Sequence, residues 1–171
     1  MALHREELRQ RIEEDDLIQD YPHLDTQLTA NGFDLTAGEI HRYEGSGQLD
    51  FSNDERELPE TTPIEPEKRD ASDEYGWWEL DPGVYKIVAN ETVRLPNDLM
   101  AFTVPRSSLL RMGATIDNAA WEAGFEGRGA FMLHVENPEG IAIKENARVN
   151  QIVFVPLEGS VEDGYDGMYR A

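Results

Sequence analysis

The sequence predicts a mainly β protein, an all-β barrel or a jelly-roll-like sandwich, with one short helix near its N-terminus. The second half of the chain alternates apolar and polar residues in runs of about five to seven, as half-buried strands do. Short strands separated by turns are typical of barrels and sandwiches. A length of 171 residues favours a single domain, residues 1–171. The turn sequences between the runs are Asp81-Pro82-Gly83, Pro96-Asn97-Asp98, Asn137–Gly140 and Glu145-Asn146.

The first half of the chain begins with the pattern of an amphipathic helix, from Leu3 to Asp16. Leu8 and Ile12 are one helical turn apart, and charged residues occupy the opposite face. Residues 28–43, LTANGFDLTAGEIHRY, then alternate apolar and polar positions around two glycines. This stretch predicts a strand with turns.

Two segments lack the pattern of a core element. Residues 44–73 are polar, contain three prolines and have few large apolar residues. We expect them to form a long surface excursion. Residues 158–171 are rich in glycine and tyrosine, and we expect a mobile tail unless a contact orders it.

The charge balance excludes several classes of partner. The chain has 35 acidic and 15 basic residues, a net charge of -20 and no cysteine, and its pI is 4.4. Two polyanions repel each other, so a nucleic acid or an anionic membrane surface is not an expected partner. No apolar run approaches the roughly 20 residues of a membrane helix, and the N-terminal sequence is not that of a signal peptide. We expect a soluble, cytoplasmic protein.

Only three of the basic residues are lysines, Lys68, Lys86 and Lys144, and the acidic residues are spread along the whole chain. Many short carboxylates with few lysines are typical of a protein that works in concentrated salt. At molar salt the Debye length is about 3 Å, so the self-repulsion of such a surface is screened. The alternative is an acidic protein that binds a basic partner.

Arg106-Ser107-Ser108 and Arg111 form a local concentration of anion-binding groups in an acidic chain. Guanidinium groups bind phosphate oxygens through paired donors, and serine hydroxyls add further donors. The alternative is that Ser107 or Ser108 caps a helix while the arginines pair with surface acids. Composition alone leaves both interpretations open.

The segment 116–129 contains a second candidate group. Its glycines occur in the order G-x-x-G-x-G and no predicted helix follows, which is not a dinucleotide-binding fingerprint. Glu122, between Trp121 and the turn at Gly124, is a candidate general base, and the alternative is a solvated loop carboxylate. The four histidines show no metal-ligand spacing.

Together these segments resemble the superfamily of the trimeric dUTPases and the dCTP deaminases, from Leu28 onward and apart from residues 44–73. ANGFDLTAGEI resembles its first motif, with the aspartate at Asp34, and LPNDLMAFTVPRSSLLRMG resembles its Arg-Ser-Ser phosphate motif. AAWEAGFEGRG resembles the uracil-binding hairpin, NARVNQIVF the strand with a phosphate-binding glutamine at Gln151, and GYDGMYRA the tail that closes over nucleotide. The resemblance implies a dUTPase-like distorted β-barrel.

The resemblance favours the archaeal-type dUTPases over the deaminases. The deaminases carry a catalytic glutamate on the strand after the hairpin, and counting from either flanking motif places Met132 there. A slip of two residues gives His134, and neither residue is a carboxylate that moves protons between water and a cytosine ring. The alternatives are a dCTP deaminase, a bifunctional enzyme, or a nucleotide-binding regulatory homologue with little turnover.

The resemblance also implies a mechanism, the hydrolysis of dUTP to dUMP and pyrophosphate by a homotrimer with sites between subunits. Mg²⁺ would bridge the phosphates, held through water by Asp34. Glu122 would activate the attacking water, where the family usually has an aspartate. Uracil would be read by backbone groups from Asn118 to Ala123, with Gly124 also in the binding site and Trp121 against the deoxyribose. The implied phosphate-binding residues are Arg106, Ser107, Ser108 and Gln151, with Arg111 at phosphate or a subunit contact, and Tyr165 and Tyr169 belong to the closing tail.

Overall fold

The computed structural model describes residues 1–169 and is mainly β, as the alternating pattern predicts. One longer helix, α1, lies near the N-terminus, and two single-turn helices, α2 and α3, follow later. The helices are α1 (Arg5–Asp15), α2 (Leu24–Gln27) and α3 (Ser107–Arg111). The strands are β1 (Ile18–Gln19), β2 (Phe33–Glu44), β3 (Glu60–Pro63), β4 (Trp77–Leu80), β5 (Gly83–Arg94), β6 (Leu99–Pro105), β7 (Ala114–Asp117), β8 (Glu126–Val135), β9 (Ile141–Lys144) and β10 (Arg148–Pro156).

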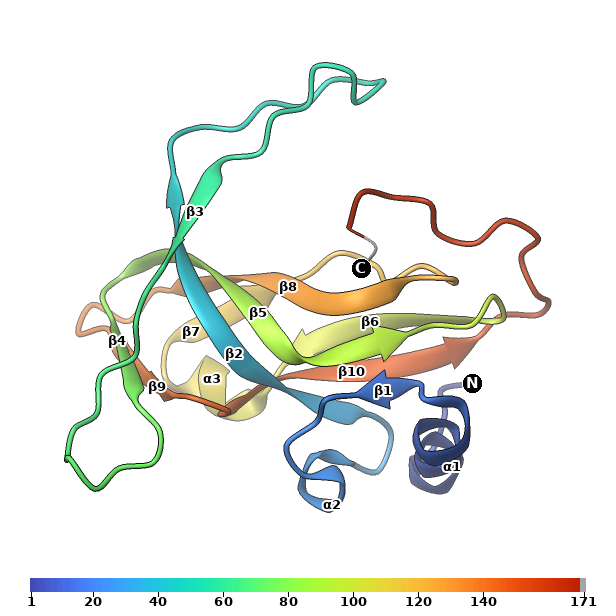
Figure 1. Cartoon of the computed structure of the whole chain (residues 1–171), viewed down its shortest axis with the longest axis horizontal. Coiled ribbons are helices and arrows are strands. Elements are labelled where there is room, and N and C mark those ends of the chain that lie inside the picture. The colour runs from blue at the N-terminus through green and yellow to red at the C-terminus, as the bar shows by residue number, and fades with distance from the viewer. Residues whose placement is uncertain (170–171) are drawn as a thin grey trace.

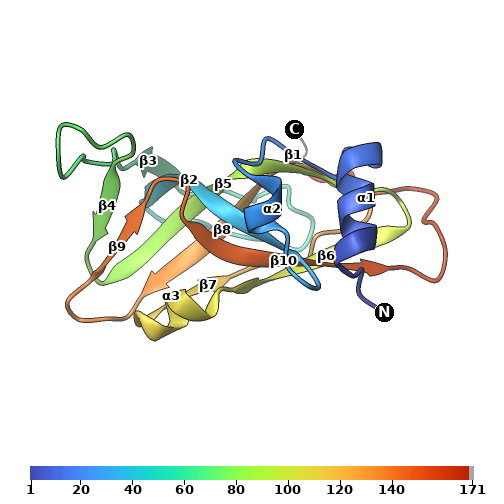
Figure 2. The same ribbon diagram turned by 90° about the horizontal axis from the view of Figure 1, so that it is seen from below.

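The main sheet has the strand order β6-β10-β2-β5-β8-β7, with β1 added to β5 and β3 added to β2. The two ends of this order, β6 and β7, lie near each other, so the sheet curves into a nearly closed barrel (Figure 1). β4 and β9 form a separate two-stranded ribbon. Figure 2 shows α1 and α2 on the outside of the barrel, beside β1, β2 and β10.

The core fills the inside of the barrel because alternate residues of β5 and β8 point inward. Each fully buried leucine, isoleucine or phenylalanine side chain contributes about 1.5–3 kcal/mol of hydrophobic stabilisation. α1 joins the core through Leu8 and Ile12, the pair that predicts the helix, and ends at Asp16 in a left-handed conformation. The largest fully buried apolar side chains are Leu8, Ile18, Phe33, Leu35, Ile40, Ile87, Leu99, Leu133, Ile152 and Phe154.

Glu91 is buried on β5 because it continues the alternation of inward-facing residues along the strand, close to the register shifts in the pairing of β5 with β2 and β8. Its carboxylate accepts hydrogen bonds from the Thr36 amide at 2.9 Å, the Thr36 hydroxyl at 2.6 Å and Gln27 Nε2 at 2.7 Å. Gln27 Nε2 also donates to the Asp34 carbonyl oxygen at 2.9 Å. Glu91 and Gln27 therefore hold the backbone of β2 at Asp34, the residue that the sequence singles out.

Residues 45–59 form an arm that extends away from the barrel and returns as β3 (Figure 1). β3 pairs with the end of β2, and Phe51 on the arm is fully exposed. Residues 158–169 run back across one end of the barrel. No helix in the described part of the chain, residues 1–169, has the length and apolar character needed to cross a membrane.

Candidate active site

The buried carboxylate of Asp34 joins two arginines and a glutamine on the outer side of the barrel. Arg106 Nε lies 3.0 Å and Arg148 Nη1 3.2 Å from Asp34 Oδ2. Gln151 Nε2, from the neighbouring strand, donates to Asp34 Oδ1 at 3.4 Å and to the Thr29 hydroxyl at 2.9 Å. Asp34 is 1% exposed, whereas about a third of each arginine side chain reaches solvent. The carboxylate thus orients two cations that remain accessible to an anion.

The electrostatics of Asp34 depend on these arginines. Burial raises the pKa of the Asp34 carboxyl, and the charges of Arg106 and Arg148 oppose this effect. Both carboxylate oxygens have protein partners. Within residues 1–169 no three His, Cys, Asp or Glu side chains are grouped so as to hold a metal ion. The role of Asp34 as a ligand that holds Mg²⁺ through water stays a prediction.

α3 begins at Ser107, directly after Arg106. Arg106 occupies the N-cap position and no side chain caps the helix, so the interpretation of Ser107 or Ser108 as the helix cap is wrong. Both serines are exposed in the first turn, and Arg111 is exposed at the end of the helix. The two serines directly follow Arg106, which pairs with Asp34, and their hydroxyl groups do not cap the helix.

The loop 118–125 connects β7 to β8 and lies against β6. Trp121 and Ala101 exchange two backbone hydrogen bonds, at 2.9 and 3.0 Å. The Trp121 ring is buried against Phe125, with ring centroids 5.2 Å apart, and against Gly129, where a Cβ atom would lie 2.4 Å from the indole. Glu122 is the next residue and is exposed. The buried tryptophan thus presents the adjacent carboxylate to solvent.

The C-terminal segment, residues 158–169, packs on this loop through Gly164 and Tyr165. Gly124 has a φ of +84° and faces Gly164, where a Cβ on either residue would collide with the opposite backbone. The Tyr165 amide donates to the Ala123 carbonyl at 2.8 Å, and its ring lies 5.4 Å from that of Phe125. Tyr169 is exposed, and its amide lies 3.4 Å from the Tyr165 hydroxyl.

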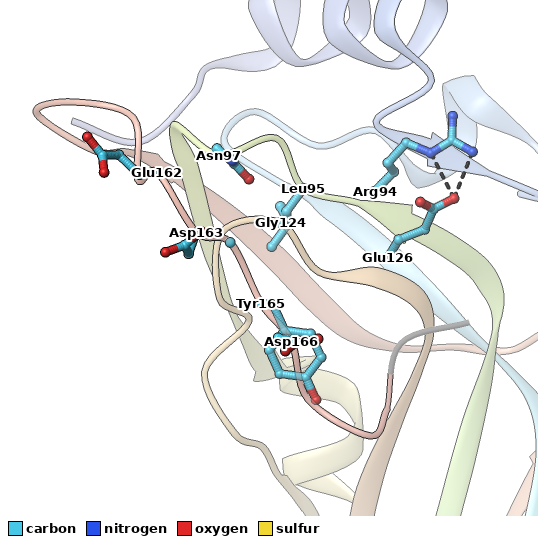
Figure 3. Close-up of a pocket in the computed structure, with 10 residues that line it drawn as sticks. Arg94, Leu95, Asn97, Gly124, Glu126, Glu162, Asp163, Tyr165 and Asp166 are labelled. Atoms are coloured by element: carbon cyan, nitrogen blue, oxygen red, sulfur yellow. Dashed lines mark hydrogen bonds and ion pairs between the residues drawn. The ribbon is translucent and has the colours of Figure 1, made fainter.

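A hollow of about 690 Å³ opens between the loop and the C-terminal segment (Figure 3). Arg94 and Glu126 form an ion pair of 2.8 Å at one side of it. Tyr165 and Gly124 contribute to its wall. The other lining residues are Leu95, Asn97, Glu162, Asp163, Gly164 and Asp166.

The structure therefore divides the residues implied by the sequence into two groups. Asp34, Arg106 and Gln151 belong to the cluster on the outer side of β2 and β10. The other group, at the loop and the C-terminal segment, contains Trp121, Glu122, Gly124, Tyr165 and Tyr169.

Two residues of the Asp34 cluster, Arg148 and Thr29, are not among those that the sequence predicts. Arg148 carries a signal, since it stands three residues before Gln151 in a chain with few basic residues. Thr29 carries none, because an uncharged residue acquires its partner only through the fold.

Comparison with known proteins decides the family. Residues 2–157 match the family described as dCTP deaminase-like. The chain belongs to this family. Proteins named probable deoxyuridine 5'-triphosphate nucleotidohydrolase are among its relatives. The one from Methanosarcina mazei is 44% identical over 154 residues, covering 90% of this chain and 86% of that protein. The one from Archaeoglobus fulgidus is 44% identical over 169 residues, covering 99% and 95%.

Among solved structures, the 2'-deoxycytidine 5'-triphosphate deaminase from Agrobacterium tumefaciens shares the fold of this dCTP deaminase-like chain. The TM-score is 0.63 at 21% identity, and the match covers 90% of this chain and 47% of that one. Met132, the position implied for the deaminase glutamate, is half-buried on β8 and pairs in register with Asp117 and Lys86.

Proposed function

We propose that the protein hydrolyses dUTP to dUMP and pyrophosphate. The observation that carries this proposal is the pair of arginines on buried Asp34, beside Gln151 and two exposed serines. Planar guanidinium groups held in fixed positions suit the oxygens of a triphosphate. The archaeal relatives named as dUTP nucleotidohydrolases, at 44% identity, support dUTP as the substrate.

In the proposed reaction the protein acts by positioning and by electrostatic stabilisation. Arg106, Ser107, Ser108 and Gln151 bind phosphate oxygens and stabilise the charge of the leaving pyrophosphate. Glu122 accepts a proton from the water that attacks the α-phosphorus. The oxygen of that water forms the new bond to phosphorus, and the bond to the bridging oxygen of pyrophosphate breaks.

The loop 118–125 provides the selectivity for uracil. Its backbone donors and acceptors would be left unpaired by a cytosine edge, which carries an amino group where uracil has a carbonyl. Met132 has no proton to exchange with a base, so ammonia release from dCTP is not expected at this site. Mg²⁺ remains a prediction from the resemblance, and would be brought by the triphosphate.

A homotrimer with sites between subunits is part of the proposal. Exposed apolar side chains lie on both sides of Arg106 along the chain. Phe102 and Val104 are 42% and 41% exposed on the outer face of β6, and Leu110 of α3 is 53% exposed. Contact between copies would cover these residues and bring the loop of one chain to the arginines of another. Light scattering at molar salt measures the assembly.

The experiment that tests the activity measures pyrophosphate and ammonia released from dUTP and from dCTP, with Mg²⁺, in molar KCl. We expect pyrophosphate from dUTP and no ammonia from dCTP. Ammonia from dCTP would assign the chain to the deaminases and overturn the role given to Met132. Binding of dUTP without either product would support the regulatory homologue instead.

A further inference from the structure

Adjacent residues of β10 make contacts on opposite faces of the barrel wall. Gln151 faces outward, to Asp34 and Thr29. Asn150 faces inward and is fully buried, and its Nδ2 donates to Asn118 Oδ1 at 2.7 Å. Two consecutive residues of β10 therefore connect the cluster around Asp34 with Asn118, the first residue of the loop 118–125.

The side chain of Asn118 is occupied at both ends. Its oxygen accepts from Asn150, and its Nδ2 lies 3.4 Å from the Thr103 carbonyl and 3.3 Å from the Ile116 carbonyl. Glu122 follows Asn118 by four residues. Between these two residues, the Trp121–Ala101 hydrogen bonds also hold the backbone of the loop to β6. The amide group of Asn118 thus fixes the loop to β6 and β10, although the residue as a whole is exposed.

The contact is made by polar groups inside an otherwise apolar wall. Among the described residues, Asn150 Oδ1 and Thr103 Oγ1 are buried without a hydrogen-bond partner. Unpaired buried polar atoms destabilise a fold, so an aliphatic residue would be the better choice at position 150 for stability alone. What the asparagine adds is a directed bond to the loop.

We propose that Asn150 is a positioning residue that sets the loop 118–125, and with it Glu122, against the barrel wall. The inference rests on the proposed function for its effect on turnover, but the geometric part stands on the contacts alone. It also assigns the side chain of Asn118 to holding the loop, which leaves the backbone of the loop to read the base.

The test replaces Asn150 by alanine and measures hydrolysis of dUTP together with amide exchange of the unliganded protein. Misplacement of a catalytic group by about 1 Å costs about 100-fold in rate, so we expect kcat to fall between about 10-fold and 100-fold. Inhibition by pyrophosphate, which reports the arginine cluster, should change by less than about threefold. The Trp121 and Ala101 amides should exchange faster, while the amides of β2 and β5 stay protected.

Two further variants keep the test decisive. Asn118→Ala removes the same bond together with the contacts to the Thr103 and Ile116 carbonyls, so the double variant should be no worse than Asn118→Ala alone. Thr103→Val is the matched control, since it removes a neighbouring buried hydroxyl that has no partner and keeps the shape. It should leave kcat and loop exchange unchanged.

The outcomes separate this inference from the proposed function. Unchanged kcat and unchanged loop exchange in Asn150→Ala would overturn the positioning role. Equal losses in Thr103→Val would also overturn it, because they would indicate a general response of the core. If the wild-type protein does not hydrolyse dUTP, the proposed function fails, and the exchange of Trp121 still decides whether Asn150 holds the loop.

Discussion

The cluster around Asp34 and the loop 118–125 are held in different ways. The Asp34 carboxylate is buried and bound by three side chains, Arg106, Arg148 and Gln151. Glu122 is exposed, and its loop is tied to the barrel by the Trp121–Ala101 bridge and by Asn118. The arginine charges are therefore held in place within the fold itself. Glu122, the proposed proton acceptor, stands on a part of the chain with fewer restraints, as groups that adjust to a substrate often do.

The largest expected effect comes from a substitution in the loop 118–125. Glu122→Gln keeps the size of the side chain and removes the group that accepts a proton, so turnover of dUTP should fall about 10²–10⁴-fold. Affinity for dUTP, which depends on the arginine cluster, should stay within about tenfold. Steady-state kinetics and calorimetric titration measure the two quantities.

Glu136→Gln is the matched control for this variant, because Glu136 is also an exposed glutamate next to β8. It should leave both quantities unchanged. Turnover that survives in Glu122→Gln would remove Glu122 from the role of base.

The second-largest effect comes from a substitution in the cluster around Asp34. Asp34→Asn keeps the shape and leaves Arg106 and Arg148 without their counter-charge. Removing one partner of a buried ion pair costs about 3–5 kcal/mol, and partial exposure of the arginines reduces this to about 2–3 kcal/mol of unfolding free energy. Binding of dUTP should weaken as well, because the guanidinium groups lose their orientation. Denaturant unfolding and calorimetry measure the two losses.

The control for the cluster is Asp25→Asn, which removes an exposed carboxylate paired with Arg9. Its unfolding free energy should match that of the wild type. If Asp34→Asn behaves like this control, the buried aspartate does not organise the arginines.

The same two regions show how much the sequence predicts. Alternation of apolar residues predicts the strands, and the Leu8–Ile12 pair predicts α1, because each pattern is local. The polar segment 44–73 contains β3, whose partner lies on β2, so that strand depends on pairing rather than on its own composition.

The contacts within the site depend on the register even more strongly. Arg148 and Asp34 are 114 residues apart in the sequence, and Asn150 and Asn118 are 32 apart. Motif resemblance predicts Asp34, Arg106 and Gln151 as site residues, and the structure brings the three together. The resemblance cannot identify what each side chain touches, because the bulges in β2, β5 and β10 that set the register leave no mark in the sequence.

A smaller effect concerns the salt dependence of stability, which should differ between the C-terminal segment and the barrel. Lowering KCl from molar to about 0.1 M lengthens the Debye length from about 3 Å to about 10 Å, so repulsion among the excess carboxylates increases. The melting temperature should fall. The C-terminal segment, which places Glu162, Asp163 and Asp166 beside the hollow, should lose amide protection before the barrel does. A melting temperature independent of salt would contradict the adaptation to concentrated salt.

The smallest effect tests the support beneath the cluster through pH. Burial raises the pKa of Glu91 above its ordinary value of 4.5, although hydrogen bonds from Thr36 and Gln27 oppose this. The folded state therefore binds the proton more tightly than the unfolded chain. This contribution to stability is fully present below the unfolded pKa and is lost as pH rises through the folded pKa. Glu91→Gln carries no proton to lose, so its unfolding free energy should fall less than that of the wild type between pH 4.5 and pH 7.

Denaturant unfolding at several pH values in molar KCl, where the other surface charges are screened, isolates this difference. Glu158→Gln, at an exposed position of the C-terminal segment, should follow the wild-type curve. Parallel curves for the wild type and Glu91→Gln would mean that Glu91 does not titrate differently in the fold. Gln27 would then hold the Asp34 backbone without help from a buried charge. A divergence confined to Glu91→Gln would show that burying the Glu91 carboxylate carries an electrostatic cost, beside the hydrogen bonds by which Glu91 holds β2 near the arginine cluster.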